Sequence, residues 1–328
     1  ITTTLDSRMQ RYAEEAVTAH MENLQREFDR QNERNTTAPF RDITTEEEEV
    51  IINRAMRNSD RWRKMAAQDI AVEDIKASFD KETDMRVFVW KDGAKEVDTV
   101  MTPRDSILYY KRFLRAGLLS LTPQTGEVKA WVGGINYKHF QYDHVKTGRR
   151  QVGSTFKPFL YATAIDQLHL SPCDTVPDIP YCIPAGDMGA QEDWCPENSS
   201  EGFKGMITLK SALANSINTV SARLMHRVGP QPVINLIDKL GVDTENIPAV
   251  PSIALGTPDL SLFEMVSAYS AFANKGVHVE PQIVSTIVDK NGTVLYQSVP
   301  KAKDIISQES AYVTVNLMEG VTQYGSGA

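Results

Sequence analysis

The sequence predicts a mixed α/β fold of the α+β type, built from antiparallel strands and helices, and three observations support this. Residues 117–121 and 127–132 have strand character and are joined by a Pro-Gln-Thr-Gly turn. Residues 283–288 and 293–297 flank Asn-Gly, the strongest short hairpin signal in the chain. From Ser154 onward, apolar residues recur at helical spacing with almost no charge, which predicts a buried helix.

The first third of the chain predicts two helices and a strand. Asp6 can cap a helix that runs to about Arg30. We expect four residues on one face of that helix, namely Met9, Tyr12, Ala16 and Leu24. Thr45 and Glu48 have the spacing of a capping box and predict a second helix. Residues 87–90 have strand character.

The rest of the chain predicts one long loop and three helical stretches. Residues 171–205 are rich in proline and glycine, and we expect them to form a long ordered loop. The helical stretches are residues 208–229 with a break near Asn215, the segment from the Ser261/Glu264 capping box to Gly276, and residues 307–320. Charges of both signs set residues 29–104 apart as an α+β insertion or subdomain between an N-terminal helix (1–28) and a main domain (105–328).

The composition is that of an ordinary globular protein, with 41% hydrophobic and 24% charged residues in a chain of 328. The net charge of -8 argues against a nucleic-acid partner, whose phosphates favour a basic face. No apolar run approaches the roughly 18 residues of a membrane span. The chain opens at Ile1 rather than at Met, so we interpret it as an excised or processed portion of a longer protein.

The cysteines and histidines do not predict a metal site. Cys173, Cys182 and Cys195 match no zinc spacing, and the sequence has no His-Glu-x-x-His motif. Cys182 and Cys195 flank a loop that contains proline and glycine. They can form a disulfide in an oxidising compartment or remain free thiols, and the sequence alone leaves both possibilities open.

Ser154 and Lys157 stand three residues apart, so their side chains share one face of a helix. Serine is a weak nucleophile that needs an adjacent base, and a lysine can be that base when burial lowers its pKa. Gly153 permits a tight entry, and Pro158 is tolerated only in a first turn, so the helix starts close to Ser154. Two further Ser-x-x-Lys matches lack this setting, and we assign no catalytic role to them. They are Ser78/Lys81 and Ser298/Lys301.

Ser216 and Asn218 form the only Ser-x-Asn triplet in the chain. Residues two apart do not share a helix face, so both side chains enter one cleft only if this step lies in a break between helices. A second hydroxyl can pass a proton onward, and an asparagine can both donate to and accept from an amide substrate. The structural alternative is a pair of helix-capping residues.

The two motifs together resemble the penicillin-recognising serine enzymes, which combine Ser-x-x-Lys, a Ser-x-Asn-type triplet and Lys-Thr-Gly. The closer similarity is to the transpeptidase domain of class A penicillin-binding proteins, the bifunctional peptidoglycan synthases. Five stretches carry this resemblance in the family's order: residues 3–6, 125–134, 150–158, 212–218 and 268–276. The resemblance implies the fold of penicillin-binding proteins and serine β-lactamases, an antiparallel sheet flanked by helices, with residues 29–104 outside the usual pattern.

The resemblance also implies an activity, that of a serine-type D-Ala-D-Ala transpeptidase/carboxypeptidase that cross-links peptidoglycan. It makes Ser154 the acylated nucleophile and Lys157 its general base. Ser216 would relay the proton to the leaving D-alanine, and Asn218 would hold the peptide amide. The implied partners are stem peptides that end in D-Ala-D-Ala, an acceptor amine from a neighbouring stem, and β-lactams. No cofactor and no metal are expected.

The position of Lys-Thr-Gly departs from the family pattern. The triplet occurs once, at residues 146–148, upstream of the nucleophile, whereas the family carries it last, on a strand beside the nucleophile helix. We interpret this copy as a chance match. The resemblance then places the family's strand beyond Ala328, so we expect residues 105–328 to form a transpeptidase domain that is incomplete at its C-terminus and impaired in acylation on its own.

Two other functions remain open. A serine β-lactamase would share the fold and the first two motifs, but it needs a base for deacylation, and no Glu-x-x-Leu-Asn pattern follows Asn218. A non-catalytic penicillin-binding-fold module of the cell envelope would need neither Ser154 nor Lys157, and the chain has both.

The family's class A members also carry an upstream membrane helix and a glycosyltransferase domain. The resemblance therefore implies a membrane-anchored, multifunctional parent protein in a bacterial cell envelope. This portion would lie on the periplasmic, extracytoplasmic side of the inner membrane.

Overall fold

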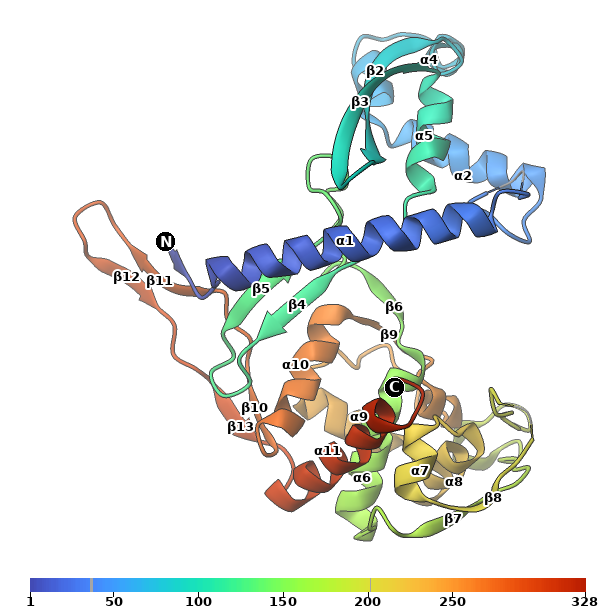
Figure 1. Cartoon of the computed structure of the whole chain (residues 1–328), viewed down its shortest axis with the longest axis vertical. Coiled ribbons are helices and arrows are strands. Elements are labelled where there is room, and N and C mark those ends of the chain that lie inside the picture. Colours follow the sequence, from blue (N-terminus) through green and yellow to red (C-terminus); the bar gives the residue numbers. More distant parts are fainter. Residues whose placement is uncertain (36–37, 201) are drawn as a thin grey trace. The chain divides into compact units, whose positions relative to one another are not determined.

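The structure is a computed structural model that describes residues 1–35, 38–200 and 202–328 (Figure 1). The chain divides into two units. The larger unit comprises residues 1–10, 117–132 and 142–328. The smaller unit comprises residues 11–116 and 133–141. None of the helices in the described residues is both long enough and apolar enough to cross a lipid bilayer.

The smaller unit contains helices and one hairpin. Its helices are α1 (Ser7–Gln31, in this unit from Arg11 onward), α2 (Thr45–Arg57), α3 (Asp60–Ala66), α4 (Val72–Ser78) and α5 (Pro103–Lys111). Strands β2 (Thr83–Trp90) and β3 (Ala94–Met101) pair antiparallel along their whole length. Two buried clusters fill this unit, one around Phe88 and Phe113 and the other around Ile52 and Phe79.

One prediction for the smaller unit is wrong by one residue, and the structure adds which side of α1 is buried. The capping box of α2 is formed by Thr44 and Glu47, one residue earlier than predicted, because each side chain accepts from the other's backbone N–H. On α1, Tyr12 and Leu24 are exposed, whereas Met21 is buried in the cluster around Phe88. Apolar residues occur on neighbouring faces of α1, and the packing of the cluster selects which of them is buried.

The larger unit contains the other helices. They are α6 (Lys157–Leu168), α7 (Leu209–Ala214), α8 (Asn218–Val228), α9 (Pro230–Lys239), α10 (Leu262–Ala273) and α11 (Gln308–Gln323), with the short 3₁₀ helices η1 (Gly153–Phe156), η2 (Asp187–Gly189) and η3 (Pro251–Leu255). The predicted box of Ser261 and Glu264 at the start of α10 is confirmed. The predicted break near Asn215 is also confirmed, because it separates α7 from α8.

The named strands of the larger unit pair antiparallel. One sheet has the order β1 (Thr2–Thr3), β11 (Val284–Val288), β12 (Val294–Gln297). The two-stranded pairs are β4 (Leu118–Leu121) with β5 (Val128–Val132), β6 (Arg149–Gln151) with β9 (Asp259–Ser261), β7 (Thr175–Asp178) with β8 (Gly205–Thr208), and β10 (Val277–Val279) with β13 (Ala302–Asp304). Both hairpins predicted from turn signals are therefore confirmed.

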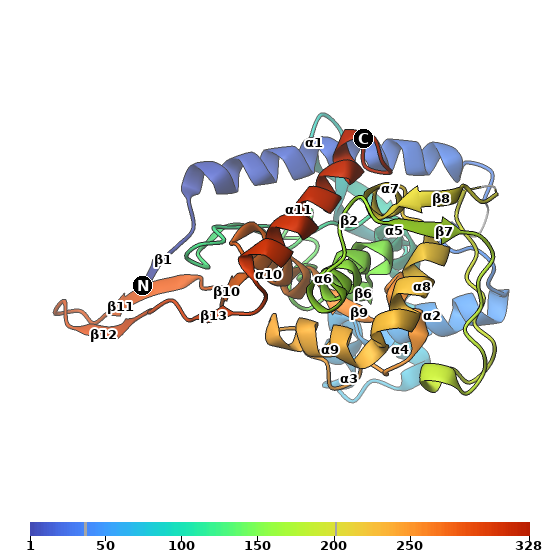
Figure 2. The same ribbon diagram turned by 90° about the horizontal axis from the view of Figure 1, so that it is seen from below.

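Helix α6 lies at the centre of the larger unit, packed against α8, α9 and α11 (Figure 2). Its residues from Lys157 to Ile165 are all buried, as its uncharged sequence predicts. The hydrophobic core continues from α6 into α8, α9 and α10. A helix surrounded in this way is fixed on every side, so the residues at its first turn are held in a defined place.

Candidate active site

The turn that carries Ser154 links strand β6 to helix α6. β6 pairs with β9 from Arg149↔Ser261 to Gln151↔Asp259. Beyond this pair of strands, the same two segments stay in contact, because the Gly153 N–H donates to the Gly256 carbonyl at 2.9 Å. Ser154 follows in η1 with its side chain exposed. The nucleophile predicted from the sequence therefore stands at the solvent-facing entrance of a buried helix.

Two glycines make this turn possible. Gly153 has φ of +56° and Gly256 has φ of +77°, a region that residues with a Cβ rarely adopt. A Cβ on Gly256 would also lie 1.8 Å from the Gly153 carbonyl oxygen. The end of η3 and the turn before Ser154 thus approach so closely that a side chain at residue 256 has no room.

Lys157, the first residue of α6, is 1% exposed. Its Nζ donates to three oxygens, the Ser216 carbonyl at 2.7 Å, Ser216 Oγ at 3.0 Å and Asn218 Oδ1 at 2.6 Å. No carboxylate pairs with it among the described residues. Burial lowers the pKa of Lys157 to about 7. A lysine in this environment can exchange protons near neutral pH.

Asn215, Ser216 and Ile217 form the break between α7 and α8. Ser216 has φ of +55°, which is uncommon for a residue with a Cβ and is stabilised here by its surroundings. Ile217 is extended and buried, and its N–H donates back to the Ala212 carbonyl. Because Ser216 leaves the helical path, its carbonyl and its hydroxyl both reach Lys157 Nζ.

Asn218 is the first residue of α8 and is held on both sides of its amide. Its Oδ1 accepts from Lys157, and its Nδ2 donates to the Glu197 carbonyl at 2.7 Å. Its backbone N–H donates to Asn198 Oδ1 at 3.0 Å. No sequence motif marks Glu197 or Asn198, because they belong to the irregular segment between β7 and β8.

The structure thus brings Lys157, Ser216 and Asn218 into direct contact. Ser154 lies one turn before Lys157 on the same segment, and the Lys157 N–H donates to its carbonyl. Its hydroxyl makes no hydrogen bond within residues 1–35, 38–200 and 202–328, so it is free to meet a ligand. The arrangement provides an exposed hydroxyl, a buried amine with a pKa near neutrality, a second hydroxyl and an amide.

Lys146-Thr147-Gly148 lies in a turn before β6 and not on a strand. Lys146 Nζ stands 5.4 Å from the centroid of the Phe263 ring, and Tyr142 donates to the Thr147 carbonyl. None of the hydrogen bonds of Lys157 involves this triplet. The triplet therefore contributes no hydrogen bond to Lys157.

The segment between β7 and β8 contains a disulfide between Cys182 and Cys195, so the alternative of two free thiols is excluded for this pair. Cys173 is a free and exposed cysteine. Within the described part of the chain, no group of three or more histidine, cysteine or acidic residues could hold a metal ion.

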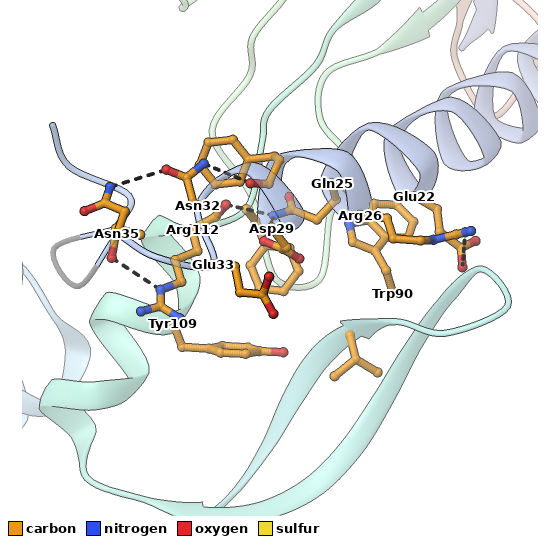
Figure 3. Close-up of a pocket in the computed structure, with 14 residues that line it drawn as sticks. Glu22, Gln25, Arg26, Asp29, Asn32, Glu33, Asn35, Trp90, Tyr109 and Arg112 are labelled. Atoms are coloured by element: carbon orange, nitrogen blue, oxygen red, sulfur yellow. Dashed lines mark hydrogen bonds and ion pairs between the residues drawn. The ribbon is translucent and has the colours of Figure 1, made fainter.

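A pocket of about 500 Å³ lies in the smaller unit, and none of the four predicted site residues lines it (Figure 3). Its polar groups serve the packing of α1. Gln25 Nε2 donates to Asp29 and to the Arg112 carbonyl, and Glu22 accepts from the Gly93 N–H. We find no nucleophile paired with a base among its lining residues, so the candidate active site is the cluster around Lys157.

Two known protein families match this chain. Residues 117–328 match the family described as penicillin binding protein transpeptidase domain, and residues 35–114 match the penicillin-binding protein middle domain. The chain belongs to the penicillin-binding protein transpeptidase family. The identification of this region with the transpeptidase domain of class A penicillin-binding proteins is thereby confirmed.

Curated relatives agree with this assignment. Penicillin-binding protein 1A of Aquifex aeolicus is 35% identical over 215 residues, which is 65% of this chain and 29% of the relative. Penicillin-binding protein 1A of Pseudomonas aeruginosa is 34% identical over 197 residues, 60% of this chain and 24% of the relative. The chain therefore spans less than a third of the length of these relatives.

Solved structures share the penicillin-binding fold. Penicillin-binding protein 1A of Haemophilus influenzae superposes with a TM-score of 0.68 at 20% identity, covering 99% of this chain and 54% of that one. The D,D-transpeptidase domain of a peptidoglycan glycosyltransferase from Eggerthella lenta gives a TM-score of 0.54 at 20% identity, covering 65% and 62%. The α+β fold class predicted for this penicillin-binding domain is confirmed.

Proposed function

We propose that this chain carries the acyl-transfer site of a D,D-transpeptidase that cross-links peptidoglycan stem peptides, with Ser154 as nucleophile. The single observation that carries the proposal is the environment of Lys157. It is a fully buried amine, its pKa is lowered to about 7, and it stands one helical turn from an exposed serine. An amine with this pKa is about half deprotonated at neutral pH, so it can act as a general base there.

The first half of the proposed reaction forms an acyl-enzyme. Ser154 Oγ attacks the carbonyl carbon of the penultimate D-alanine while Lys157 Nζ accepts the hydroxyl proton. When the tetrahedral intermediate collapses, the amide C–N bond breaks. The proton passes from Lys157 through the Ser216 hydroxyl, 3.0 Å away, to the nitrogen of the leaving D-alanine. The result is an ester on Ser154 and free D-alanine.

The second half resolves the ester. An acceptor amine from a neighbouring stem peptide attacks the ester carbonyl and gives its proton to Lys157. When the tetrahedral intermediate collapses, the C–O bond to Ser154 breaks, Lys157 returns the proton to Ser154 Oγ, and the new amide bond cross-links the two stems. Water as the acceptor would give carboxypeptidase activity. Asn218 holds the amide of the donor peptide in both steps, since its own amide is oriented by Lys157 and Glu197. A β-lactam acylates the same serine by opening its ring.

The proposal extends to the parent protein and its location. We propose a membrane-anchored penicillin-binding protein with an upstream glycosyltransferase domain, acting on the extracytoplasmic side of the inner membrane. The Cys182–Cys195 disulfide supports an oxidising compartment, because disulfides are rare in the reducing cytosol.

The test is covalent labelling of the full-length protein by a fluorescent penicillin. The wild type should be labelled, Ser154→Ala should not, and mass spectrometry of the digested adduct should place the acyl group on Ser154. The matched control is Ser298→Ala, which removes the serine of another Ser-x-x-Lys sequence and should label normally. Equal labelling of Ser154→Ala would remove Ser154 as nucleophile, and no labelling of the wild type would favour a non-catalytic binding module. Rapid loss of the label by hydrolysis would favour a β-lactamase.

A further inference from the structure

Asp178, the last residue of β7, is a completely buried carboxylate, with 0% of its surface exposed. It forms no ion pair with a described residue. Instead Oδ1 accepts from Thr219 Oγ1 at 2.6 Å and from Asn198 Nδ2 at 2.8 Å, and Oδ2 accepts from the Lys204 N–H at 2.8 Å. Burial raises the pKa of Asp178, but the hydrogen bonds outweigh it and the pKa is lowered, so the group is an anion at neutral pH.

Asn198 connects this carboxylate to the site. Because its Nδ2 donates to Asp178, its Oδ1 must face the other way. There it accepts from the N–H groups of Asn218 at 3.0 Å and Thr219 at 3.3 Å. Helix α8 has Ile217 at its N-cap position and no side-chain cap of its own. Asn198, twenty residues earlier in the sequence, therefore supplies the acceptor that the N-terminus of α8 lacks.

The residues fixed in this way belong to the site described above. Asn218 Oδ1 accepts from Lys157, and Asn218 Nδ2 donates to the carbonyl of Glu197, the neighbour of Asn198. The segment 197–198 thus holds both the backbone and the side chain of Asn218. Cys195, in the disulfide with Cys182, anchors the same segment a few residues upstream.

We propose that Asp178, acting through Asn198, is a positioning residue that holds the Ser216–Asn218 step against Lys157 during acyl transfer. The inference rests on the proposed function. Neither residue touches Lys157 or Ser154 through a hydrogen bond, so both act on the reaction only through Asn218 and Thr219. The buried carboxylate only accepts hydrogen bonds, so it keeps the Nδ2 of Asn198 toward itself and the Oδ1 of Asn198 toward α8. A neutral side chain at residue 178 would not enforce this orientation.

Exchanging the side chains of Asp178 and Asn198 can distinguish the loss of their hydrogen bond from a general disturbance of the structure. In Asp178→Asn, one oxygen of the carboxylate becomes an NH₂ group. This new donor then faces either the Asn198 Nδ2 donor or the Lys204 N–H donor, and one of these hydrogen bonds is lost. In Asn198→Asp, two carboxylates face each other. In the double variant D178N/N198D, the amide at 178 donates to the carboxylate at 198, and that carboxylate still accepts from the two N–H groups of α8. Donor and acceptor are exchanged, and the total charge of the pair is unchanged.

The experiment measures the rate constant of acylation at saturating fluorescent penicillin, together with the melting temperature, on the full-length protein. Asn198 is only partly buried, so Asn198→Ala should fold. We expect this variant and each single swap to lose about tenfold to a hundredfold in the rate constant, because small misplacements of a reacting group cost this much. The double swap should be faster than either single swap. Ser267→Ala, which removes a buried hydrogen bond between Ser267 on α10 and His278 on β10, is the control for a merely structural loss and should keep the wild-type rate constant.

Two outcomes overturn the inference. One is a wild-type rate constant in Asn198→Ala, and the other is a double swap that is no faster than the faster of the two single swaps. Both leave the proposed function intact as long as labelling requires Ser154. If Ser154→Ala is labelled like the wild type, the proposed function itself fails, and the failure is visible before any variant of Asp178 is compared.

Discussion

The two halves of the candidate site are positioned in different ways. The Ser154–Lys157 half is defined by its own neighbourhood in the sequence, because Gly153 permits the turn and Pro158 marks the helix start. The Ser216–Asn218 half is a break between two helices, held by side chains and carbonyls from other segments. The first half therefore depends on a turn of consecutive residues that packs closely against Gly256, and the second depends on hydrogen bonds from several distant segments. Substitutions in each half can test that difference.

The largest effect is expected at the residue that joins the halves. Lys157→Ala should lower the acylation rate constant by about a thousandfold, since a positioned general base contributes about 10² to 10⁴. The measurement is stopped-flow acylation by a fluorescent penicillin. Lys301→Ala, in the Ser298-x-x-Lys301 sequence that receives no chemistry, is the matched control and should react normally. A loss of less than tenfold in Lys157→Ala would exclude Lys157 as the base.

The local turn is tested by adding one carbon atom. Gly256→Ala places a Cβ 1.8 Å from the Gly153 carbonyl oxygen and at φ of +77°. We expect the free energy of unfolding to fall by about 3 kcal/mol or more, well above the roughly 1–2 kcal/mol of the backbone conformation alone. Gly292→Ala, with φ of +87° and no atom within 4 Å of the added Cβ, isolates that conformational cost. If urea denaturation gave the same loss of unfolding free energy for both variants, the close contact between residues 153 and 256 would not contribute to the effect.

The pH dependence of acylation tests the protonation state of Lys157. The reactive form is the neutral amine, so the rate constant should fall about tenfold per pH unit below the pKa of about 7 and level off above it. The sign for stability follows from the same lowered pKa. Between pH 7 and the ordinary value of 10.5 the unfolded chain binds more protons at Lys157 than the folded chain. The wild type should therefore gain stability relative to Lys157→Met as pH rises through this window, and a gain at falling pH would contradict the assignment.

The smallest effect is expected at the disulfide. Cys182→Ser/Cys195→Ser loosens the segment that carries Glu197 and Asn198 but leaves their hydrogen bonds in place. The acylation rate constant should fall by about threefold, equivalent to about 0.7 kcal/mol in the barrier. Cys173→Ser, at a free and exposed cysteine, should have no effect. A loss as large as that of Asn198→Ala would mean that the disulfide, and not the buried carboxylate, holds the segment.

Local signals predicted much of the framework in which these experiments are set. The β4–β5 and β11–β12 hairpins, the buried helix α6 and the break after α7 follow from turn residues and apolar spacing. The capping box forms at Thr44 and Glu47, one residue before the predicted pair, and both arrangements have the same local spacing. Which side of α1 is buried depends on other elements, because Met21 packs into the cluster around Phe88.

The sequence alone predicts the candidate site residues, because Ser154-x-x-Lys157 stands at the start of an uncharged helix and is followed by the single Ser-x-Asn triplet, at Ser216 and Asn218. How these side chains meet follows from the packing of distant segments. The lowered pKa of Lys157 comes from burial in the core, and the left-handed Ser216 is stabilised by contacts across the fold. Asp178 and Asn198 carry no motif, since hydrogen bonds between segments twenty or more residues apart leave no local pattern in a sequence.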